Sequence, residues 1–396
     1  MEIRLLDDRD TWNSWVGEQP VGDILQSYDW GEFKSSLGWK TLRLAVLDKS
    51  KNGCSQNGRG RVAACAQVFL RRIPIGTIAY CPRGPIFDPA YPEPAGKLLE
   101  AIHEICRREG AICLKVEPPL RDSASGHRTF IEWGFRRGDE IQPRSTLVVD
   151  LSHDLASLST RLDIKTRYNI GLAGRKGVRV VEAGDDGAVI FHSLLQATSQ
   201  RAGFSIHSLE YYDKVWRLLR SRNMAQLLLA TYDDEVLSGA MLFRLANHAY
   251  YMYGASSGQR RNLKPSDLLQ WECLKWAKSV GCTTYDMWGI PDEVGQAVAA
   301  GRSVEDLDKG MGNGKNGLAQ RGSNGAKGKG ARDGESLWGV YRFKRGFGGD
   351  VIRFVGAYDY VYSASRYLLW VRSMPLLRQF VSKVGRVRYL DKVGAT

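Results

Sequence analysis

Two stretches of the chain carry the same succession of apolar and polar positions. Each has a strand-like apolar segment, a second shorter one, a polar loop, an amphipathic helix and a closing strand. In the first stretch these elements are expected at Val62–Phe69, Thr77–Tyr80, Pro94–Glu109 and Gly110–Glu117. In the second stretch they are expected at Val236–Phe243, Ala249–Gly254, Pro265–Val280 and Gly281–Gly289. The pattern predicts an internal repeat.

The repeated unit points to a mixed α/β fold. Each helix carries an apolar stripe at helical spacing, formed by Leu98, Ile102 and Ile105 in the first and by Leu269, Cys273, Trp276 and Val280 in the second. Short strands around a single helix are typical of a mixed sheet. Two such units in tandem predict two α/β domains with a cleft between them, which is a favoured place for a ligand. We expect a first domain over residues 1–150, completed by about 357–396, and a second over 151–356.

Composition narrows the class of protein. The 396 residues are 43% hydrophobic and 25% charged, as in ordinary globular proteins of more than one domain. The net charge of +13 favours anionic partners such as nucleic acid, phosphorylated substrates or an acidic membrane face. No apolar run is long enough to span a bilayer, and the N-terminus lacks a signal peptide. Seven scattered cysteines without a CxxC pair predict reduced thiols in a cytoplasmic protein and no metal site.

The positive charge gathers in two segments. One runs from Arg161 to Arg179, and the other runs from Arg366 to the end of the chain. In the second, Tyr367, Trp370, Met374, Leu377, Val381 and Val384 recur at helical spacing. We expect Ser365–Val384 to form a helix, kinked or broken at Pro375, that docks on the inner face of the plasma membrane. The alternative is that the apolar stripe packs against the first domain.

A glycine-rich segment interrupts the second domain. Residues 301–334 hold almost no apolar side chain, so we expect a disordered insertion. Its Gly310–Gly317 run superficially matches a phosphate-binding loop. That interpretation is disfavoured because neither a strand before it nor a helix after it is expected.

Three short motifs combine basic residues with aromatic residues, prolines or glycines. On a helix over Gln26–Lys34, Trp30 and Lys34 share a face and could hold a phosphate or sugar. In Tyr80–Asp88, two prolines and a glycine form a rigid loop that presents Arg83 and Asp88 at the end of a sheet. The alternatives are an amphipathic helix with a solvated Lys34, and a turn in which Asp88 caps backbone N–H groups.

The third motif, Gly339–Gly349, alternates basic and aromatic residues and is expected to be a strand. A lysine held among aromatic side chains, as Lys344 is here, can stabilise negative charge on a carbonyl oxygen. The alternative is an edge strand protected by charge. The chain has no hydrolase-type nucleophile motif. A transferase whose attacking amine belongs to the substrate needs only positioning, an oxyanion stabiliser and anion anchors.

Together these segments resemble the FemABX family of peptidoglycan aminoacyltransferases, whose members look like two fused GNAT acyltransferase domains. The resemblance is carried by the order and spacing of five segments: QSYDWGEFK, YCPRGPIFD, Lys165–Val178, Leu268–Pro291 and Gly339–Val361. It implies transfer of an amino acid from aminoacyl-tRNA to the stem-peptide amine of lipid II or its UDP-linked precursor. No cofactor beyond the aminoacyl-tRNA co-substrate is implied.

The resemblance also implies roles for particular residues. Lys34 and Arg201 resemble the family's anchors for the precursor diphosphate. Lys344, with Phe343 beside it, resembles the lysine near the reacting carbonyl. Tyr80 and Asp88 fall in the precursor-binding loop and Tyr253 in the facing strand. We therefore expect Lys344, Phe343 and Asp88 to be catalytic, and expect substrate to be bound by Lys34, Trp30, Tyr80, Arg83, Arg201 and Tyr253.

Two other functions remain open at this point. A CoA-dependent N-acyltransferase could share the fold, but the loop Gln259–Ser266 lacks the paired glycines with which such enzymes grip pyrophosphate. A nucleic-acid-binding or scaffold protein would account for the charge, but it would leave the repeat and the rigid Pro/Gly loop unexplained.

Overall fold

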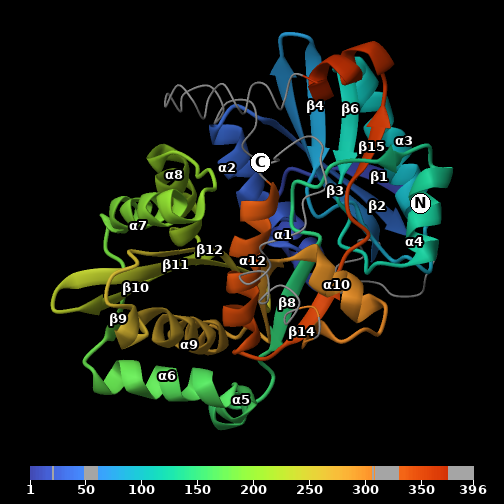
Figure 1. Ribbon diagram of the computed structural model, residues 1–396. Coiled ribbons are helices and arrows are strands. Elements are labelled where there is room, and N and C mark those ends of the chain that lie inside the picture. The colour runs from blue at the N-terminus through green and yellow to red at the C-terminus, as the bar shows by residue number, and fades with distance from the viewer. Residues whose placement is uncertain (20–21, 49–60, 306, 308–329, 373–396) are drawn as a thin grey trace, which may run out of the picture.

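The chain folds around two mixed sheets, one in each half of the molecule (Figure 1). The computed structural model describes residues 1–19, 22–48, 61–305, 307 and 330–372. The first sheet has the strand order β1-β2-β3-β4-β6-β15-β7, with the short β5 paired to β3, and the second has the order β9-β10-β11-β12-β13-β8-β14.

The strands of the first sheet lie mostly in the N-terminal part of the chain. They are β1 (Glu2–Leu5), β2 (Lys40–Asp48), β3 (Arg61–Ile73), β4 (Gly76–Cys81), β5 (Ile86–Phe87), β6 (Ala111–Val116), β7 (Arg136–Arg137) and β15 (Tyr358–Val361). Those of the second sheet are β8 (Ser145–Asp150), β9 (Arg179–Glu182), β10 (Ala225–Tyr232), β11 (Glu235–Leu245), β12 (His248–Ser256), β13 (Thr284–Ile290) and β14 (Asp350–Arg353).

The two sheets repeat each other strand by strand, which confirms the predicted mixed α/β repeat. In each, neighbouring strands are antiparallel except for one central parallel pair, β4 with β6 and β12 with β13. A single crossover helix joins each parallel pair, as parallel strands require. These helices are α3 (Glu93–Arg108) and α9 (Pro265–Ser279), and the predicted stripe residues Leu98, Ile102, Leu269 and Cys273 are buried on them.

Each half of the chain contributes one strand to the sheet of the other half. β8 directly follows the first unit in sequence but pairs with β13 and β14 in the second sheet. β15 follows the second unit but pairs with β6 and β7 in the first. The expected boundary at residue 150 is therefore too late by one strand. Ser145–Asp150 is an apolar segment that could extend either sheet, and only long-range pairing decides which.

Helices of the first half are α1 (Arg9–Glu18), α2 (Tyr28–Ser36), α3 and α4 (Ala124–Glu132), with a 3-10 turn, η1 (Ile24–Gln26), before α2. Ser27 caps α2 by accepting the Trp30 N–H, as serine does at a helix start. Trp30 and Phe33 of α2 then pack edge-to-face against Phe243 and Tyr211 of the second half. The halves thus share one apolar core.

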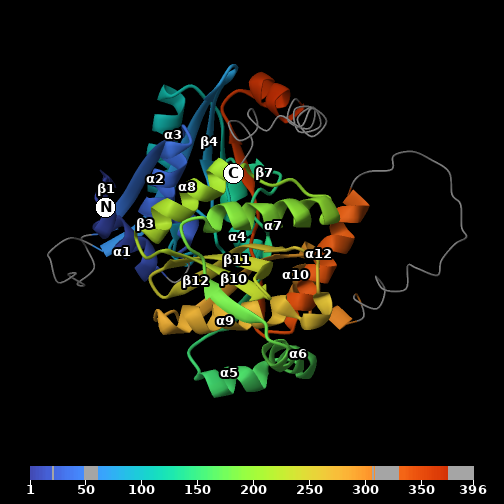
Figure 2. The same cartoon turned by 90° about the vertical axis from the view of Figure 1, so that its left-hand side faces the viewer.

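Helices of the second half are α5 (Leu155–Arg161), α6 (Ile164–Arg175), α7 (Gly187–Ala202), α8 (Leu209–Arg220), α9, α10 (Asp292–Ala299) and α12 (Gly330–Arg345), with η2 (Arg261–Leu263) before α9. In Figures 1 and 2, α7 and α8 cover one face of the second sheet and α9 covers the other. α5 and α6 form a further layer beyond α9. α12 stands between the halves and its end packs on β13.

Two sequence-based expectations concern segments that are only partly described. Most of the glycine-rich insertion, residues 308–329, lies outside the described residues, but its expected end at residue 334 is too late because α12 begins at Gly330. The predicted tail helix is described only to residue 372, where residues 364–372 are helical. Tyr367 and Trp370 of its stripe pack on Ile73, Ile78 and Ile112 of the first sheet. No helix among the described residues is long and apolar enough to cross a membrane.

Candidate active site

The second sheet opens at its centre, between β12 and β13. The two strands pair in parallel only from His248 with Thr284 to Tyr250 with Asp286, although both continue beyond these residues. Pairing also shifts register on either side of the opening, in β12 against β11 and in β13 against β8. Within the β13 irregularity Trp288 adopts a φ of 63°, which is uncommon for a bulky residue. Such bulges interrupt the ladder and let a side chain from elsewhere reach the strand edge.

Lys344 occupies this opening. Its Nζ donates a hydrogen bond to the Gly289 carbonyl oxygen at 2.7 Å and lies 5.9 Å from the centre of the Tyr251 ring. The side chain is 5% exposed, and burial lowers the pKa of Lys344 to about 7 while the charge of Asp286 opposes that shift. The ammonium form therefore depends on a nearby negative charge.

The segment that carries Lys344 is a helix, so the predicted strand over Gly339–Gly349 is wrong. Buried side chains recur every three residues, at Trp338, Tyr341, Lys344 and Phe347, which is close to a helical period. Basic and aromatic residues alternate over the five residues YRFKR, as they would on a strand. Five residues are too few to distinguish the two-residue period of a strand from the 3.6-residue period of a helix. Phe343 is half-buried and packs edge-to-face on Phe347.

Two buried carboxyl groups and Arg83 link this site to the first half. Asp286 accepts hydrogen bonds from the Thr146 hydroxyl and the Trp288 N–H, and burial raises its pKa while Arg83 and Lys344 oppose the shift. Arg83 lies 3.6 Å from Asp23 and 4.3 Å from the Phe354 ring centre. Burial raises the pKa of Asp23 to about 6 against the pull of Arg83. Arg83 thus pairs with Asp23 and acts electrostatically on Asp286, and its role in binding substrate stays a prediction.

Tyr80 and Asp88 are placed differently from each other. The buried Tyr80 hydroxyl donates to Glu117, whose carboxylate also accepts the Ile141 and Gln142 N–H groups. Asp88 lies in an exposed turn and accepts the Ala90 N–H at 2.9 Å. That contact is the turn-capping alternative considered above. Neither residue contacts Lys344 within the described structure.

Lys34 forms a second buried cation site with residues that the sequence did not indicate. Its Nζ lies 5.3 Å from the Trp39 ring, and Arg71 lies 5.3 Å from the same ring. Lys34 is only 2% exposed, and its pKa is lowered to about 7 by burial and then by Arg71. Burial and the charge of Lys34 lower the pKa of His207 to about 4. Cations that destabilise one another in this way are stabilised when an anion binds among them.

The aromatic residue expected beside Lys34 is replaced by another. Trp30 is packed in the core between the halves, 5.2 Å from Phe33 and 5.8 Å from Phe243. Trp39, five residues after Lys34 and outside α2, takes the place predicted for Trp30 beside the ammonium. Tyr253 reaches the same region through Tyr211, whose hydroxyl is 3.3 Å from that of Tyr253 and whose ring stacks on His207.

Arg201 lies at the C-terminal end of β12, beyond the residues that pair with β13. It is in the last turn of α7 and donates to the Ser256 carbonyl and hydroxyl oxygens, at 3.3 and 2.9 Å. Arg261 is close enough to lower the pKa of Arg201, after burial. In the described structure Arg201 makes no contact with Lys34. The structure therefore joins Lys34 to Tyr253, and Lys344 to Arg83 through Asp286, and leaves Arg201 and Asp88 apart from both groups.

The arrangement matches a known family. The sequence matches the FemAB family over residues 8–233 and 216–298. This chain belongs to the FemAB family. It is similar to the lipid II:glycine glycyltransferase of Staphylococcus aureus (strain USA300), with 24% identity over 94% of this chain and 96% of that protein. The enzyme of the same name from Staphylococcus epidermidis (strain ATCC 12228) is 23% identical over the same shares.

Solved structures give the same fold. The crystal structure of FemX superposes with a TM-score of 0.72 at 21% identity, covering 93% of this chain and 99% of that one. The predicted FemABX membership, the α/β fold with two mixed sheets and the assignment as an acyltransferase are thereby confirmed. Sequence patterns did not single out Asp286, Arg71, Trp39 or His207. Asp286 could have been found, because it is an acidic residue within the apolar closing strand Gly281–Gly289. No local pattern marks the other three residues.

Proposed function

We propose that this protein is an aminoacyltransferase that moves an amino acid from aminoacyl-tRNA to the stem-peptide amine of lipid II or its UDP-linked precursor. The observation that carries the proposal is the buried Lys344 ammonium in the opening between β12 and β13, beside Asp286. The likeness to enzymes named lipid II:glycine glycyltransferase supports the substrate class. The buried Lys34, with the half-buried Arg71 beside the same Trp39 ring, is suited to the precursor diphosphate.

The reaction needs little covalent chemistry from the protein. The substrate amine attacks the ester carbonyl, the new C–N bond forms, and the C–O bond to the tRNA ribose breaks as the amine's proton is lost and the ribose hydroxyl is restored. Lys344 has three N–H donors and uses one on the Gly289 carbonyl. A second can hold the tetrahedral oxyanion, which is the usual way that a buried donor stabilises acyl transfer. The charge of Asp286 favours the ammonium form of Lys344 against the effect of burial.

The loop before α9 favours this reaction over one that uses CoA. Helix N-termini bind phosphates through free backbone N–H groups. Here α9 begins at Pro265, which has no N–H, and the preceding residues Arg260 and Lys264 adopt left-handed backbone conformations without glycine. No observation in this loop favours a pyrophosphate cradle.

The decisive experiment is a transfer assay with purified protein. Lipid II or the UDP-linked precursor is incubated with tRNA charged with one amino acid at a time, and the product is weighed by mass spectrometry. We expect a gain of one aminoacyl residue on the precursor. A gain only with acyl-CoA, or none with any charged tRNA, would refute the proposed donor.

We further propose that the C-terminal segment contacts the membrane that carries lipid II. In residues 364–372, Leu368, Leu369 and Val371 are exposed beside Arg366 and Arg372. Exposed apolar and basic residues on one short helix suit an anionic interface. Co-sedimentation should show binding to anionic vesicles that weakens at high salt and on Leu368→Ser/Leu369→Ser substitution. Equal binding to neutral vesicles would contradict electrostatic docking.

A further inference from the structure

α6 and the start of β9 expose a row of cations. Lys165, Arg167, Arg175, Lys176 and Arg179 are all exposed. None of them lies within ion-pair distance of a carboxylate in the described part of the chain, whereas the exposed Arg217 and Arg220 of the second half each pair with an aspartate. We call these five residues the α6 basic surface. Unpaired cations of this density repel one another, so an anionic partner stabilises them.

The same surface exposes apolar groups among the charges. Tyr168 is 60% exposed and Ile164 81% exposed. Cations interleaved with an exposed aromatic ring are typical of surfaces that bind single-stranded nucleic acid, because phosphates meet the cations and bases stack on the ring. A membrane-binding helix would need a continuous apolar face. α6 instead turns Ala173 and Thr166 inward and keeps only these two large apolar side chains outside.

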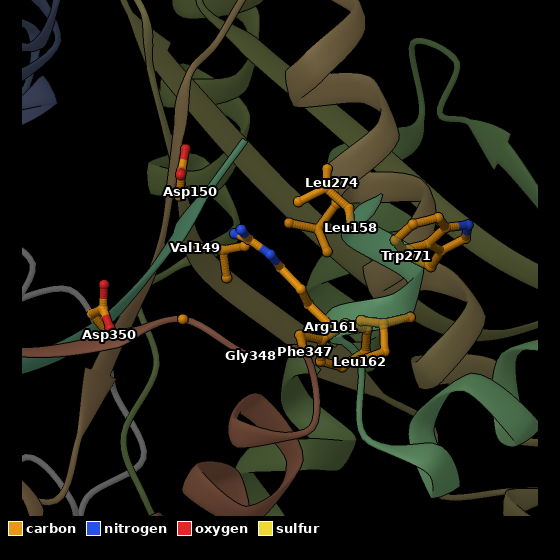
Figure 3. A pocket seen from close by; sticks show the side chains of 11 residues that line it. Val149, Asp150, Leu158, Arg161, Leu162, Trp271, Leu274, Phe347, Gly348 and Asp350 are labelled. Atoms are coloured by element: carbon orange, nitrogen blue, oxygen red, sulfur yellow. The ribbon is translucent and has the colours of Figure 1, made fainter. Parts of the chain in front are cut away.

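A pocket lies beside this surface, under α5. It has a volume of about 160 Å³, and its walls are Leu158, Leu162, Leu274, Trp271 and Phe347. Figure 3 shows Arg161 lying across its middle, with Leu158 and Leu274 on one side and Val149 on the other. The rim carries the carboxylates of Asp150 and Asp350. The pocket is smaller than the roughly 300–1,000 Å³ of typical small-molecule sites, so it suits one planar group rather than a whole ligand.

The chemistry of the pocket suits a nucleobase. Apolar walls and an indole accept a flat ring, a guanidinium stacks on it or donates to its acceptors, and a rim carboxylate accepts from an exocyclic amino group. Each of these groups is present among Trp271, Arg161 and Asp150.

The pocket lies one helical turn along the chain from Lys344. Phe347, which lines it, donates its N–H to the Lys344 carbonyl oxygen at 3.0 Å. Phe347 and Tyr251, the ring under the Lys344 ammonium, belong to the same apolar cluster between the second sheet and α9. Lys34 and Tyr253 belong instead to the shared core between the halves. An aminoacyl donor that reached Lys344 from the α9 side of the second sheet would therefore leave the opposite side, which faces the shared core, to the precursor.

We propose that the α6 basic surface and this pocket bind the single-stranded 3′ end of the donor RNA. The cations contact its phosphates, Tyr168 stacks on a base, and the pocket takes a further base one helical turn along the chain from Lys344. This inference rests on the proposed function, because it names the surface that an aminoacyl-tRNA would use.

Direct binding of uncharged RNA tests the surface without relying on catalysis. The probe is a labelled RNA hairpin with a four-nucleotide 3′ overhang, followed by fluorescence anisotropy. The triple variant Lys165→Gln/Arg167→Gln/Arg175→Gln should bind at least ten-fold more weakly at 0.1 M salt. Its slope of log affinity against log salt should be smaller by about 2, since each single-strand phosphate contact contributes about 0.7. The control Arg72→Gln/Arg107→Gln/Arg128→Gln removes the same charge from the first half and should bind within about two-fold of the wild type.

The pocket is tested by the overhang. The wild type should prefer the overhang hairpin to a blunt one, and Arg161→Gln and Trp271→Leu should each lose most of this preference while the salt slope stays close to wild type. If Trp271→Leu fails to fold, Arg161→Gln carries the test alone, because Arg161 is an exposed residue whose substitution should leave the fold intact. An unchanged preference in Arg161→Gln would refute the pocket.

The other outcomes separate this inference from the proposed function. If the α6 triple variant and the control triple variant lose equal RNA affinity, only the net charge matters, and the proposal that the α6 basic surface binds RNA is refuted. Loss of anionic-vesicle binding with RNA affinity retained would overturn it in favour of a membrane contact. Transfer from charged tRNA with unchanged kcat/KM in the α6 triple would also refute the surface and leave the function intact. RNA binding with the expected variant effects, but no transfer from any charged tRNA, would support the surface and refute the donor.

Discussion

At the scale of single residues, the protein keeps two lysines buried at a cost to the fold. The pKa of each is lowered to about 7, Lys34 by burial and then Arg71, and Lys344 by burial. Water solvates an ammonium far better than a protein interior does, so a buried lysine is retained where it meets a negative charge. For Lys344 that charge is proposed to be the oxyanion, and for Lys34 the diphosphate.

Lys344→Met should lower turnover by about 100- to 1,000-fold, the usual effect of removing one oxyanion donor, with little change in precursor affinity. Steady-state kinetics and calorimetry measure the two effects. Lys278→Met is the matched control, because Lys278 also donates to a backbone carbonyl, that of Leu151 at 2.9 Å, on the same half. Near-wild-type turnover in Lys344→Met would show that this lysine only closes the sheet opening.

Lys34 should couple precursor binding to proton uptake. Because an anion favours the ammonium form, binding raises the pKa of Lys34 from about 7, and affinity should rise as the pH falls from 8 to 6. Calorimetry of the UDP-linked precursor in two buffers of different ionisation enthalpy measures the protons taken up. Lys34→Ala should abolish most of the uptake and weaken binding by about 1.5–3 kcal/mol, as for a lost charge-assisted hydrogen bond. The exposed Lys40→Ala, which breaks only a pair with Glu109, should change neither.

The same residue should affect stability with a definite sign. Between about pH 7 and 10.5 unfolded Lys34 is protonated and folded Lys34 is largely neutral, so its contribution to the free energy of unfolding rises with pH. Lys34→Met should remove this slope and should unfold at a higher temperature than the wild type below pH 7. A lower melting temperature at pH 6 would show that other contacts of Lys34 outweigh its burial.

At the scale of elements, the junction between α12 and β14 fixes where Lys344 points. Gly349 has a φ of 100°, and a Cβ there would lie 2.6 Å from the Val148 carbonyl oxygen. Gly349→Ala should therefore cost more than the roughly 1–2 kcal/mol of a left-handed alanine alone. Gly281, with a φ of 84° and open space around it, is the matched control and should show only that cost. Denaturant unfolding measures both, and equal losses would mean that β14 moves away freely.

At the scale of the whole molecule, the exchange of β8 and β15 and the shared core should make the halves unfold together. A single calorimetric transition is expected, with van 't Hoff and calorimetric enthalpies nearly equal. Phe130→Ala in the first half and Met287→Ala in the second remove fully buried side chains and should each cost about 2–5 kcal/mol. Both should lower the same transition. Two transitions, each moved by only one variant, would contradict this coupling.

The sequence by itself determined the repeat, the crossover helices and the family, because these rest on local periodicity and on the order of short motifs. It also singled out Lys34, Lys344 and Arg83, since basic residues among aromatic residues and prolines stand out without a structure. The tertiary structure alone decided that α12 is a helix at Lys344, that β8 and β15 change sheets, and that Trp39, rather than Trp30, lies beside Lys34. It also brought Arg71 and His207 to Lys34 and Asp286 to Lys344. The reason is physical: strand partners and charge neighbours are set by contacts between segments far apart in the chain, and no local pattern encodes them.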